Sequence, residues 1–497
     1  MRAFLIAITI VLLFSNQTQA EVTTNKQKIV EYYIKLIRND TSWLKLVEQK
    51  AIKQNLSVEK AIHNDAEFMY SKNPRLDVPL EKPKEPIFTC FGSLQLAPLS
   101  IGILFALLSM FFFFKLNMEK TSIVLLMFSG LSVRLFMVLL NGYINEWDEV
   151  VHALVAKNMM ENPFHPMLFK NPIFPLDEFN WSQGHIWLHK QPLFLWQMAL
   201  SMKIFGVSIF SIRFPSIIMT SILIYFIYRI GRLSFNQQVG YIAALLSVFS
   251  FYIMELIVGG VFTDHNDIAF LFYVCASFWA WVEYEKATGR KKLIFLILIG
   301  IFSGCAVLVK WLVGLLVYAG WGMSIILYNE RRKQLKNYLH IGISLTITLI
   351  VFLPWQIYIL GTFPTLSTFE YLHNSKHFFE VLEGHSGGVW YHFSMINELY
   401  GFNPFYLLIV FICFLVVTKN SPIKTAIITN VSIIYLFFTI AATKMPSFTF
   451  VVSFLIFIMI GVVISTLFEL IEEKNRIKNN NLKILAKVSF LVILIFP

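Results

Sequence analysis

The segment PLFLWQMALSMKIF, Pro192–Phe205, sets the topology that the rest of the chain must follow. Its 14 residues are mostly apolar but include Gln197 and Lys203, and a membrane-spanning helix needs about 20 apolar residues. If the segment lies in the membrane interface, all the Lys and Arg clusters between the long apolar runs fall on one side. If it crosses, the early and late clusters fall on opposite sides. Because basic loops gather in the cytoplasm, we predict an interfacial helix.

Long apolar runs on both sides of this segment predict an all-α, polytopic integral membrane protein. We expect about 12 transmembrane helices, with interfacial helices in a large extracytoplasmic first loop. The expected spans are 96–114, 122–141, 214–230, 238–258, 266–283, 293–309, 311–328, 339–360, 404–418, 424–442, 448–468 and 484–496. The last run is barely long enough to cross, which indicates a truncated chain.

The composition excludes a soluble cytoplasmic enzyme. Of the 497 residues, 57% are hydrophobic and 14% are charged, whereas a soluble domain carries about 25% charged residues. Three of the four cysteines lie inside apolar runs and Cys90 has no evident partner, so a secreted disulfide scaffold is excluded too. In a membrane protein, the net charge of +11 is typical of basic cytoplasmic loops.

The chain before the first span has two parts. Residues 1–20 have a basic start, an apolar run and small residues before Glu21, which predicts a signal peptide or an uncleaved anchor. Residues 21–95 form an extracytoplasmic segment, in which apolar residues recur at helical spacing up to residue 73. The prolines of 74–86 indicate a linker. Residues 96–497 then form the membrane domain.

The predicted outer face collects most of the titratable side chains. Its two long loops, roughly 142–213 and 361–403, and its short turns hold nine of the eleven histidines. Titratable groups gathered beside apolar helices indicate an active site at the membrane surface. A channel or ion-coupled transporter should instead show ionisable residues deep within several spans, where only Arg134 and Glu255 are candidates.

Eight short motifs follow one another on this face. They are Asn145–Glu149 (NEWDE), His189–Leu193 (HKQPL), Arg213–Ser216 (RFPS), Thr263–His265 (TDH), Leu308–Lys310 (LVK), Leu353–Trp355 (LPW), Leu372–Asn374 (LHN) and Thr443–Pro446 (TKMP). Over about residues 120–450 their order resembles the GT-C class of membrane glycosyltransferases, in the group of protein O-mannosyltransferases and the lipid A aminoarabinose transferase.

The resemblance implies transfer of a sugar, with inversion, from a polyprenyl-phosphate-sugar donor to an extracytoplasmic acceptor. Lipid A or another glycolipid, an envelope glycan and a protein are all open as acceptors, and the implied location is the bacterial inner membrane. A lipid-borne donor needs an apolar groove for its tail, cations for its phosphate and a carboxylate for the acceptor. The sequence shows no Gly-rich phosphate loop for a nucleotide sugar.

The resemblance assigns three acidic residues to catalysis. Asp148 matches the family's first-loop aspartate, which acts as general base or orients the acceptor. If the acceptor is an ionised phosphate, Asp148 holds a metal or a substrate amine instead, and an Asp before an apolar run is also a common helix cap. Asp264 matches the second acidic position and Glu149 completes an acidic pair, whereas Asp267 is equally well explained as a helix cap.

The resemblance also assigns basic residues to the donor phosphate. Lys190 matches the family's loop lysine, and a fixed cation lowers the barrier by stabilising the charge that the leaving phosphate gathers. Arg213, Lys444 and Lys310 are further candidates, with anchoring at the membrane interface as the alternative for each. Where the family often has Arg, this chain has approximately His377, so Lys376 or a protonated His377 is expected to make the second phosphate contact.

Two further departures concern a metal and an aromatic residue. His189 stands where the family often has Glu, and in some relatives this position and that of His373 bind a structural metal. Zinc accepts imidazole readily, but structural zinc usually has four ligands, so both a zinc site and two hydrogen-bonding histidines remain open. Phe448 stands where the family often has Tyr.

A transporter or flippase of lipid-linked sugars is the main alternative. It predicts internal repeats and interrupted helices in two matching halves, and no such repeat is visible. A scaffold role carried by residues 21–73 is a third alternative, which would survive loss of every outer carboxylate. No nucleic-acid partner is expected.

Overall fold

The computed structural model divides the chain into two compact units, Met1–Gly92 and Ser93–Pro497. It describes residues 30, 33–34, 36–38, 41–54, 56–72, 93–172, 176–180, 182–261, 263–473 and 480–495. The predicted signal peptide or anchor (1–20) and the predicted linker (74–86) lie outside the described residues. Each unit is described separately below.

The first unit is helical, as the apolar spacing predicts. Its helices are α3 (Thr41–Lys53) and α4 (Val58–Lys72), and described residues between 30 and 38 are helical as well. Ile37, Val47 and Ala61 are among the residues of its small apolar core. A salt bridge of 2.7 Å between Arg38 and Glu59 lies on its surface.

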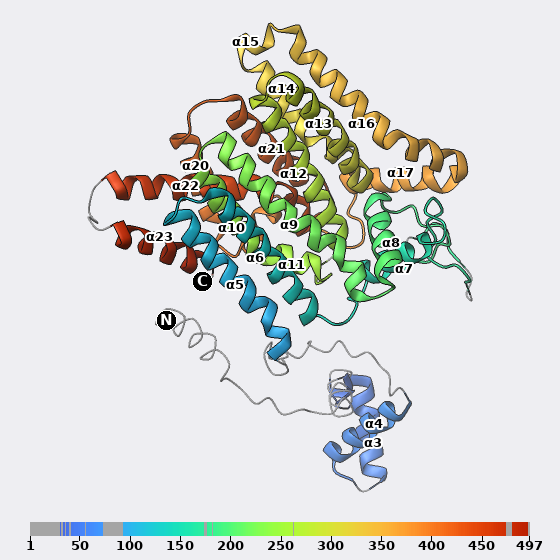
Figure 1. The fold of residues 1–497 in the computed structure, drawn as a ribbon. Coiled ribbons are helices and arrows are strands. Elements are labelled where there is room, and N and C mark those ends of the chain that lie inside the picture. Colours follow the sequence, from blue (N-terminus) through green and yellow to red (C-terminus); the bar gives the residue numbers. More distant parts are fainter. Residues whose placement is uncertain are drawn as a thin grey trace. The chain divides into compact units, whose positions relative to one another are not determined.

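The second unit is built from helices throughout its described residues (Figure 1). In chain order they are α5 (Ser93–Phe114), α6 (Glu119–Leu140), α7 (Asp148–Met159), α8 (Leu193–Phe205), α9 (Ile209–Ser234), α10 (Gln237–Val248), α11 (Phe251–Ile257), α12 (Asp264–Lys286), α13 (Gly289–Lys310), the 3₁₀ helix η1 (Trp311–Leu315), α14 (Leu316–Ile326), α15 (Asn329–Arg332), α16 (Leu335–Thr362), α17 (Pro364–Phe379), α18 (Tyr391–Ser394), α19 (Ile396–Tyr400), α20 (Pro404–Val417), α21 (Pro422–Ile440), η2 (Pro446–Val452), α22 (Ser453–Glu473) and α23 (Asn480–Ile495).

Seven stretches of the described chain are long and apolar enough to cross a membrane. They are Leu96–Phe114, Glu119–Leu140, Ile209–Ser234, Gly289–Ile326, Leu335–Thr362, Pro422–Ile440 and Pro446–Leu470. Two bent pairs, α10 with α11 (47°) and Tyr391–Tyr400 with α20 (92°), raise the number to nine. The polytopic all-α class is therefore confirmed, whereas the count of 12 is not.

Three expected spans account for the difference. The runs 293–309 and 311–328 form one stretch, Gly289–Ile326, which is interrupted by η1. The final run forms α23, which has 16 residues and is shorter than each of the seven stretches above. The run 266–283 forms α12, which has 23 residues but carries acidic side chains at both ends.

Helix α12 tolerates this polarity because protein surrounds it. Most of its residues are buried, and it packs against α9 and α13. Charged side chains are costly against lipid but acceptable inside a helical bundle. The acidic start of α12 therefore lies inside the protein, where α7 and η2 also contact it.

Helices α13 and α16 approach closely because of two glycines. A Cβ at Gly300 would lie 2.6 Å from the carbonyl oxygen of Ser344, and one at Gly304 would lie 2.6 Å from the Cβ of Val351. Small residues four apart let membrane helices pack backbone to backbone. This contact brings Lys310, at the end of α13, near α17, which follows α16.

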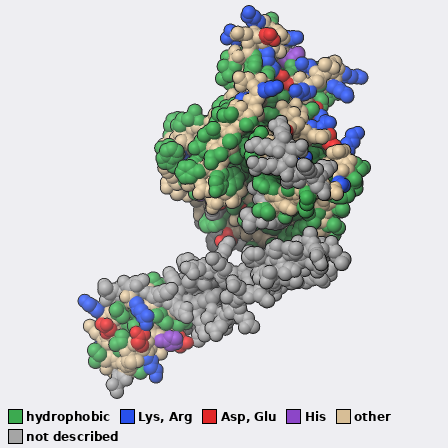
Figure 2. Space-filling model, turned by 90° about the vertical axis from the view of Figure 1, so that its left-hand side faces the viewer, with side chains coloured by type: hydrophobic (Ala, Val, Ile, Leu, Met, Phe, Trp, Pro, Cys, Tyr) green, Lys and Arg blue, Asp and Glu red, His purple; other side chains and the backbone are tan. Residues whose placement is uncertain are grey.

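Charged groups separate to the two ends of the unit. Helix α16 has 28 residues and so spans about 42 Å, with α15 before it and α17 after it. Ion pairs Arg229–Glu283, Arg232–Glu119 and Arg331–Glu285 occur at the α15 end, which we call the basic end. Figure 2 shows Lys and Arg at the top of that view, above a mainly hydrophobic surface.

The opposite end carries α7, α8 and α17, and we call it the site end (Figure 1). Helix α8 has 13 residues, or about 20 Å, so it is too short to cross a bilayer core of about 30 Å. This agrees with the prediction for Pro192–Phe205. Helix α8 packs against α7 and α9.

Candidate active site

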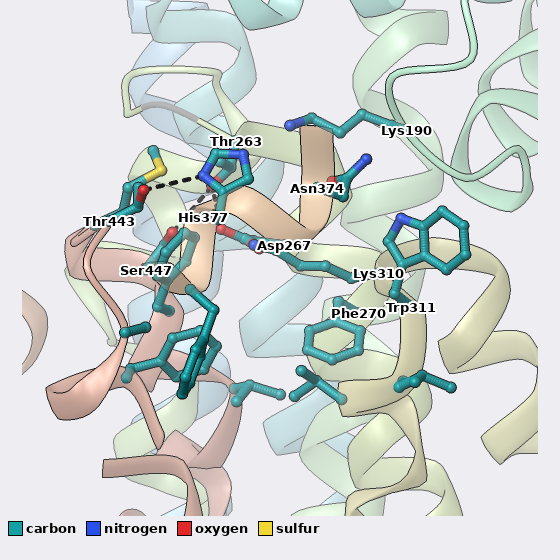
Figure 3. Close-up of a pocket in the computed structure, with 18 of the residues that line it drawn as sticks. Lys190, Thr263, Asp267, Phe270, Lys310, Trp311, Asn374, His377, Thr443 and Ser447 are labelled. Carbon is teal, nitrogen blue, oxygen red and sulfur yellow. Dashed lines mark hydrogen bonds and ion pairs between the residues drawn. The ribbon is translucent and has the colours of Figure 1, made fainter. Parts of the chain in front are cut away.

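A cavity of about 710 Å³ opens among the segments of the site end (Figure 3). Its titratable lining residues include Lys190, Asp267, Lys310 and His377, which come from four separate segments. The rest of the wall is dominated by apolar side chains, among them Phe270, Leu312, Val313, Phe378, Phe379, Phe437, Phe438, Phe448, Phe450 and Val451. The cavity therefore has the amphipathic lining that a lipid phosphate requires.

Asp148 is tied to the rim of this cavity through the backbone. It is the first residue of α7, and its Oδ2 accepts a hydrogen bond of 3.0 Å from the backbone N–H of Thr263, which lines the cavity. Burial raises the pKa of the Asp148 carboxyl, but His152, Lys190 and the Thr263 amide together outweigh burial, so the net pKa is lowered. Asp148 is therefore ionised at neutral pH.

The backbone is strained on both sides of this hydrogen bond. Trp147, before α7, has φ 67°, and Thr263 and Asp264, at the start of α12, have φ 73° and 33°. Non-glycine residues seldom adopt positive φ, and such residues cluster at functional sites. Contacts between the two acidic helix starts, such as the bond from the Thr263 N–H to Asp148, keep the backbone in this strained conformation.

Asp264 is fully buried beside His152. Its Oδ1 lies 3.0 Å from His152 Nδ1, and its Oδ2 is buried without a hydrogen-bond partner among the described residues. His152 follows Asp148 by one helical turn on α7 and packs against Phe194, with ring centroids 4.8 Å apart. Neither Asp148 nor Asp264 lines the cavity directly; Asp148 is bonded to the lining residue Thr263, whereas Asp264 contacts His152.

Asp267 is the acidic residue of α12 that reaches the cavity. Its carboxylate accepts hydrogen bonds from Lys310 and from the Thr263 hydroxyl. The Lys310 ammonium also lies 5.0 Å from the ring centroid of Phe448. Figure 3 shows Lys310 extending to Asp267 within the cavity. Because Asp267 contacts Lys310 inside the cavity, it belongs to the candidate site and is not only a helix cap.

Lys190 and His189 lie at the start of the segment that leads into α8. Lys190 lines the cavity (Figure 3), and His189 Nδ1 lies 3.4 Å from Glu370 Oε2 on α17. Burial is the main cause that lowers the pKa of His189 well below its ordinary value, and burial raises the pKa of Glu370. This pair joins the α8 segment to α17.

His189 and His373, for which zinc binding and hydrogen bonding are both open, lie close together in the structure. The rings of His189 and His373 are 6.0 Å apart between centroids. No group of three or more His, Cys, Asp or Glu in the described residues could hold a metal ion. Two histidines alone are fewer than the four ligands usual for structural zinc, so we derive no step through a metal.

His377 connects α17 to the turn before η2. Its Nδ1 lies 3.2 Å from the Thr443 hydroxyl, and the Thr443 N–H donates to the His377 carbonyl at 3.0 Å. Burial and the nearby Lys190 lower the pKa of His377 to about 4. His377 is therefore neutral at pH 7, which does not support the expectation of a protonated His377. Lys376, the other candidate for that contact, is exposed and does not line the cavity.

Glu149 and Arg213 form a buried pair away from the cavity lining. Arg213 donates to both carboxylate oxygens, at 2.7 and 3.0 Å, and to the carbonyls of Asn141 and Tyr143. His265 Nε2 lies 3.2 Å from Glu149 Oε1. Burial raises the pKa of Glu149, but His265 and Arg213 outweigh it and hold the pKa at about 2. Glu149 is predicted to be catalytic and Arg213 to bind the donor phosphate, but neither lines the cavity.

Lys444 is also placed differently from its predicted phosphate-binding role. It is buried, and its ammonium donates to the carbonyls of Phe438, Thr439 and Ala441 at the end of α21. A Lys that satisfies the last carbonyls of a helix is a common C-terminal cap. Among the predicted cations, Lys190 and Lys310 are the two that line the cavity in the described residues.

The site also contains residues that the motifs did not single out. Glu370 is one, and its signal is the spacing of Glu370, His373 and His377 on one face of α17. Trp311 is another, and its signal is its position directly after Lys310. His152 is a third, and its signal is its spacing of four residues from Asp148, which places both side chains on the same face of α7.

Residues 189–358 match a family model described as dolichyl-phosphate-mannose-protein mannosyltransferase. An uncharacterized protein of Aquifex aeolicus is 25% identical over 320 residues, which cover 61% of this chain and 57% of that protein. The undecaprenyl phosphate-alpha-4-amino-4-deoxy-L-arabinose arabinosyl transferase 2 of Pseudomonas fluorescens is 27% identical over 205 residues, 39% of this chain and 35% of that protein. The chain thus spans less than two thirds of either relative.

Two solved structures share the fold. ArnT from Cupriavidus metallidurans bound to undecaprenyl phosphate superposes with a TM-score of 0.55 at 16% identity, over 68% of this chain and 59% of that one. The archaeal oligosaccharyltransferase AglB from Archaeoglobus fulgidus, in complex with an inhibitory peptide and a dolichol-phosphate, gives 0.52 at 13% identity over 75% and 54%. The chain therefore shares the fold of these two proteins. The resemblance inferred from the motifs is confirmed, and the protein is an integral membrane protein.

Proposed function

We propose that this protein transfers a sugar from a polyprenyl-phosphate-sugar donor to an extracytoplasmic acceptor. The observation that carries the proposal is the cavity, where Lys190 and Lys310 line a largely apolar wall and Lys190 lies near Asp148. A polyprenyl phosphate has the matching chemistry, with a charged head and an apolar tail. The names of the relatives, which mention undecaprenyl phosphate and dolichol-phosphate, support the same donor class.

The proposed reaction is a direct displacement at the anomeric carbon. An acceptor hydroxyl oxygen forms a bond to this carbon while the bond to the donor phosphate oxygen breaks, which inverts the configuration. Asp148, ionised at neutral pH, takes the hydroxyl proton as general base. Lys190 and Lys310 stabilise the charge that collects on the leaving polyprenyl phosphate.

The positions of the charges support an acceptor on the extracytoplasmic side. The basic end carries the Lys and Arg of the α15 loop, which the positive-inside rule assigns to the cytoplasm, and the cavity lies at the site end. A glycolipid such as lipid A, an envelope glycan and a protein hydroxyl are all compatible with this side. If the acceptor is already ionised, Asp148 would orient it or hold its amine rather than remove a proton.

The direct test is the Asp148→Asn variant. We expect transfer to fall by about 10²–10⁴-fold, the usual contribution of a general base, while binding of undecaprenyl phosphate stays within about twofold because Lys190 and Lys310 remain. Transfer is measured by mass spectrometry of envelope lipids and glycoproteins from cells that express either form. Binding is measured on purified protein in nanodiscs.

Asp177→Asn is the matched control, because Asp177 is exposed in the same predicted outer loop and does not line the cavity. Normal transfer by the Asp148→Asn variant would contradict the catalytic assignment. Movement of the lipid-linked sugar across the membrane without any glycosylated product would favour the transporter alternative.

A further inference from the structure

Trp311 forms one wall of the cavity directly beside Lys310 (Figure 3). It has φ 58° and ψ −154°, a backbone conformation that is essentially confined to glycine. It joins the end of α13 to η1, so this conformation turns the chain sharply after Lys310. A bulky aromatic residue at such a position indicates that the indole is needed at the cavity wall.

The indole packs against Tyr371 of α17, which also lines the cavity. The two ring centroids are 4.9 Å apart in an edge-to-face arrangement at 66°, which is a favoured geometry for aromatic pairs. Trp311 itself is partly exposed. One face of the ring system is therefore supported by protein while part of it remains accessible to a ligand.

A chain of hydrogen bonds runs from Tyr371 to a second cavity residue. The Tyr371 hydroxyl donates to Gln356 Oε1 at 2.7 Å, and Gln356 Nε2 donates to Gln191 Oε1 at 2.8 Å. These two bonds fix the orientation of the Gln191 amide. Gln191 is 1% exposed and lines the cavity, and its Nε2 has no hydrogen-bond partner among the described residues. The Gln191 amide can therefore donate a hydrogen bond to a ligand or to water in the cavity.

Asn374 adds an acceptor to the same region. Its Nδ2 donates to the Glu370 carbonyl at 2.8 Å, which directs its Oδ1 away from that bond. Asn374 also lines the cavity and lies between Lys190 and Trp311 in Figure 3. The cavity thus combines an accessible aromatic surface, an amide donor and an amide acceptor beside the two lysines.

This combination matches the chemistry of a sugar ring. A pyranose presents a face of C–H groups, which packs on an aromatic ring, and a rim of hydroxyls, each of which donates and accepts hydrogen bonds. A prenyl chain would use the aromatic surface but none of the amides. A few convergent polar groups in an otherwise apolar pocket are the usual source of ligand orientation.

We propose that Trp311, Gln191 and Asn374 form the subsite for the sugar of the donor, with Trp311 as its platform. This inference rests on the proposed function, since Lys190 and Lys310 hold the phosphate to which that sugar is attached. The subsite makes Trp311 a specificity-determining residue that binds the sugar but not the polyprenyl phosphate alone.

The test compares the affinity of the full-length protein in nanodiscs for undecaprenyl phosphate and for its glycosides. The probes are bare undecaprenyl phosphate and its mannosyl, glucosyl and 4-amino-4-deoxy-arabinosyl esters. The readout is the sugar preference, the ratio of the Kd of the bare lipid to the Kd of the best glycoside. We expect a preference above about threefold in the original protein, and its reduction by about three- to tenfold in Trp311→Gly.

Glycine is chosen because it adopts the backbone conformation of residue 311 without strain, so this variant should fold. Trp311→Phe keeps an aromatic face and should retain part of the preference. Trp390→Ala is the matched control, because Trp390 is 75% exposed and does not line the cavity. The affinity of all three variants for bare undecaprenyl phosphate should stay within about twofold of the original.

Two results would overturn the subsite. One is an equal loss of affinity for bare and glycosylated lipid in Trp311→Gly, which would show that the indole packs against the prenyl chain. The other is a sugar preference of one in the original protein. If the original protein does not bind bare undecaprenyl phosphate at all, the proposed function itself fails, which is a distinct outcome.

Discussion

The neighbouring acids Asp148 and Glu149 have opposite surroundings. Successive residues on a helix point about 100° apart, so Asp148 lies at the cavity rim while Glu149 points into a cage formed by Arg213, His265 and the Asn145 N–H. Glu149 is 1% exposed and Arg213 has no exposed surface. Both residues are carboxylates, but their surroundings give them different roles: Asp148 is available to the site, whereas Glu149 stabilises the fold.

We expect Glu149→Gln to destabilise the protein by about 3–5 kcal/mol, the usual cost of leaving one charge of a buried pair without its partner. The measurement is the free energy of unfolding of the purified protein in mixed micelles, followed by circular dichroism. Glu149→Gln combined with Arg213→Met should recover part of this loss, because the uncompensated charge is removed. An unchanged stability in Glu149→Gln would contradict the structural role of the pair.

The same pair predicts a pH dependence. The pKa of Glu149 is about 2 in the folded protein, against 4.5 ordinarily, so its contribution is present above about pH 4.5 and is lost as the pH falls toward 2. Linkage converts this difference to about 3 kcal/mol. The loss of stability below pH 4.5 should therefore be smaller in Glu149→Gln than in the original protein.

Lys444 caps the C-terminal end of α21 and is therefore not available to bind the donor phosphate. The last carbonyls of α21 have no hydrogen-bond partners within the helix. The Lys444 ammonium donates hydrogen bonds to the carbonyls of Phe438, Thr439 and Ala441. The turn that carries Lys444 is itself held to α17 by the bond from the Thr443 N–H to His377. Lys444 thus stabilises the joint between α21 and η2.

Lys444→Met should therefore act on stability rather than on the donor. Loss of charged hydrogen bonds should lower the free energy of unfolding by about 2 kcal/mol, with the affinity for undecaprenyl phosphate changed less than twofold. Lys310→Met should instead weaken undecaprenyl phosphate binding by roughly 10–100-fold, and it should also lower stability, because the buried Asp267 loses its ion-pair partner. If Lys444→Met weakens binding as strongly as Lys310→Met, Lys444 contacts the phosphate after all.

The whole membrane unit separates its charges along α16. The α15 loop, with Arg331 paired to Glu285, lies at the basic end, and α17, with Glu370 and His377, lies at the site end. A helix of 28 residues keeps these two ends about 42 Å apart, which exceeds the hydrocarbon core of a bilayer. The two ends must therefore face different compartments.

Cysteine labelling tests which end faces which compartment. In a protein whose four native cysteines are replaced by Ala, Leu372→Cys on α17 and Leu335→Cys at the start of α16 are compared; Leu372 and Leu335 are 60% and 81% exposed. A membrane-impermeant maleimide should label Leu372→Cys in intact spheroplasts and Leu335→Cys only after permeabilisation. The reverse pattern would place the cavity in the cytoplasm and contradict the proposed extracytoplasmic acceptor.

Local sequence properties suffice for the fold class, for the short length of α8 and for the joint location of most candidate residues. Apolar run length sets which segments cross a membrane, and the distribution of Lys and Arg sets their direction. The predicted span count is less accurate, because α12 is buried by its neighbours rather than by lipid and η1 interrupts one apolar stretch without changing its composition.

The contributions of individual cations depend on contacts between distant segments. Lys190, Lys310, Arg213 and Lys444 all follow the same local pattern, a basic residue next to an apolar helix. Arg213 is occupied by Glu149, 64 residues earlier in the chain, and Lys444 by carbonyls that become free only where α21 ends. Lys190 and Lys310 line the cavity because α13 packs on α16 and brings α17 over them. The charge and spacing of these residues in the sequence do not predict which groups they contact, because the packing of the helices brings those groups together.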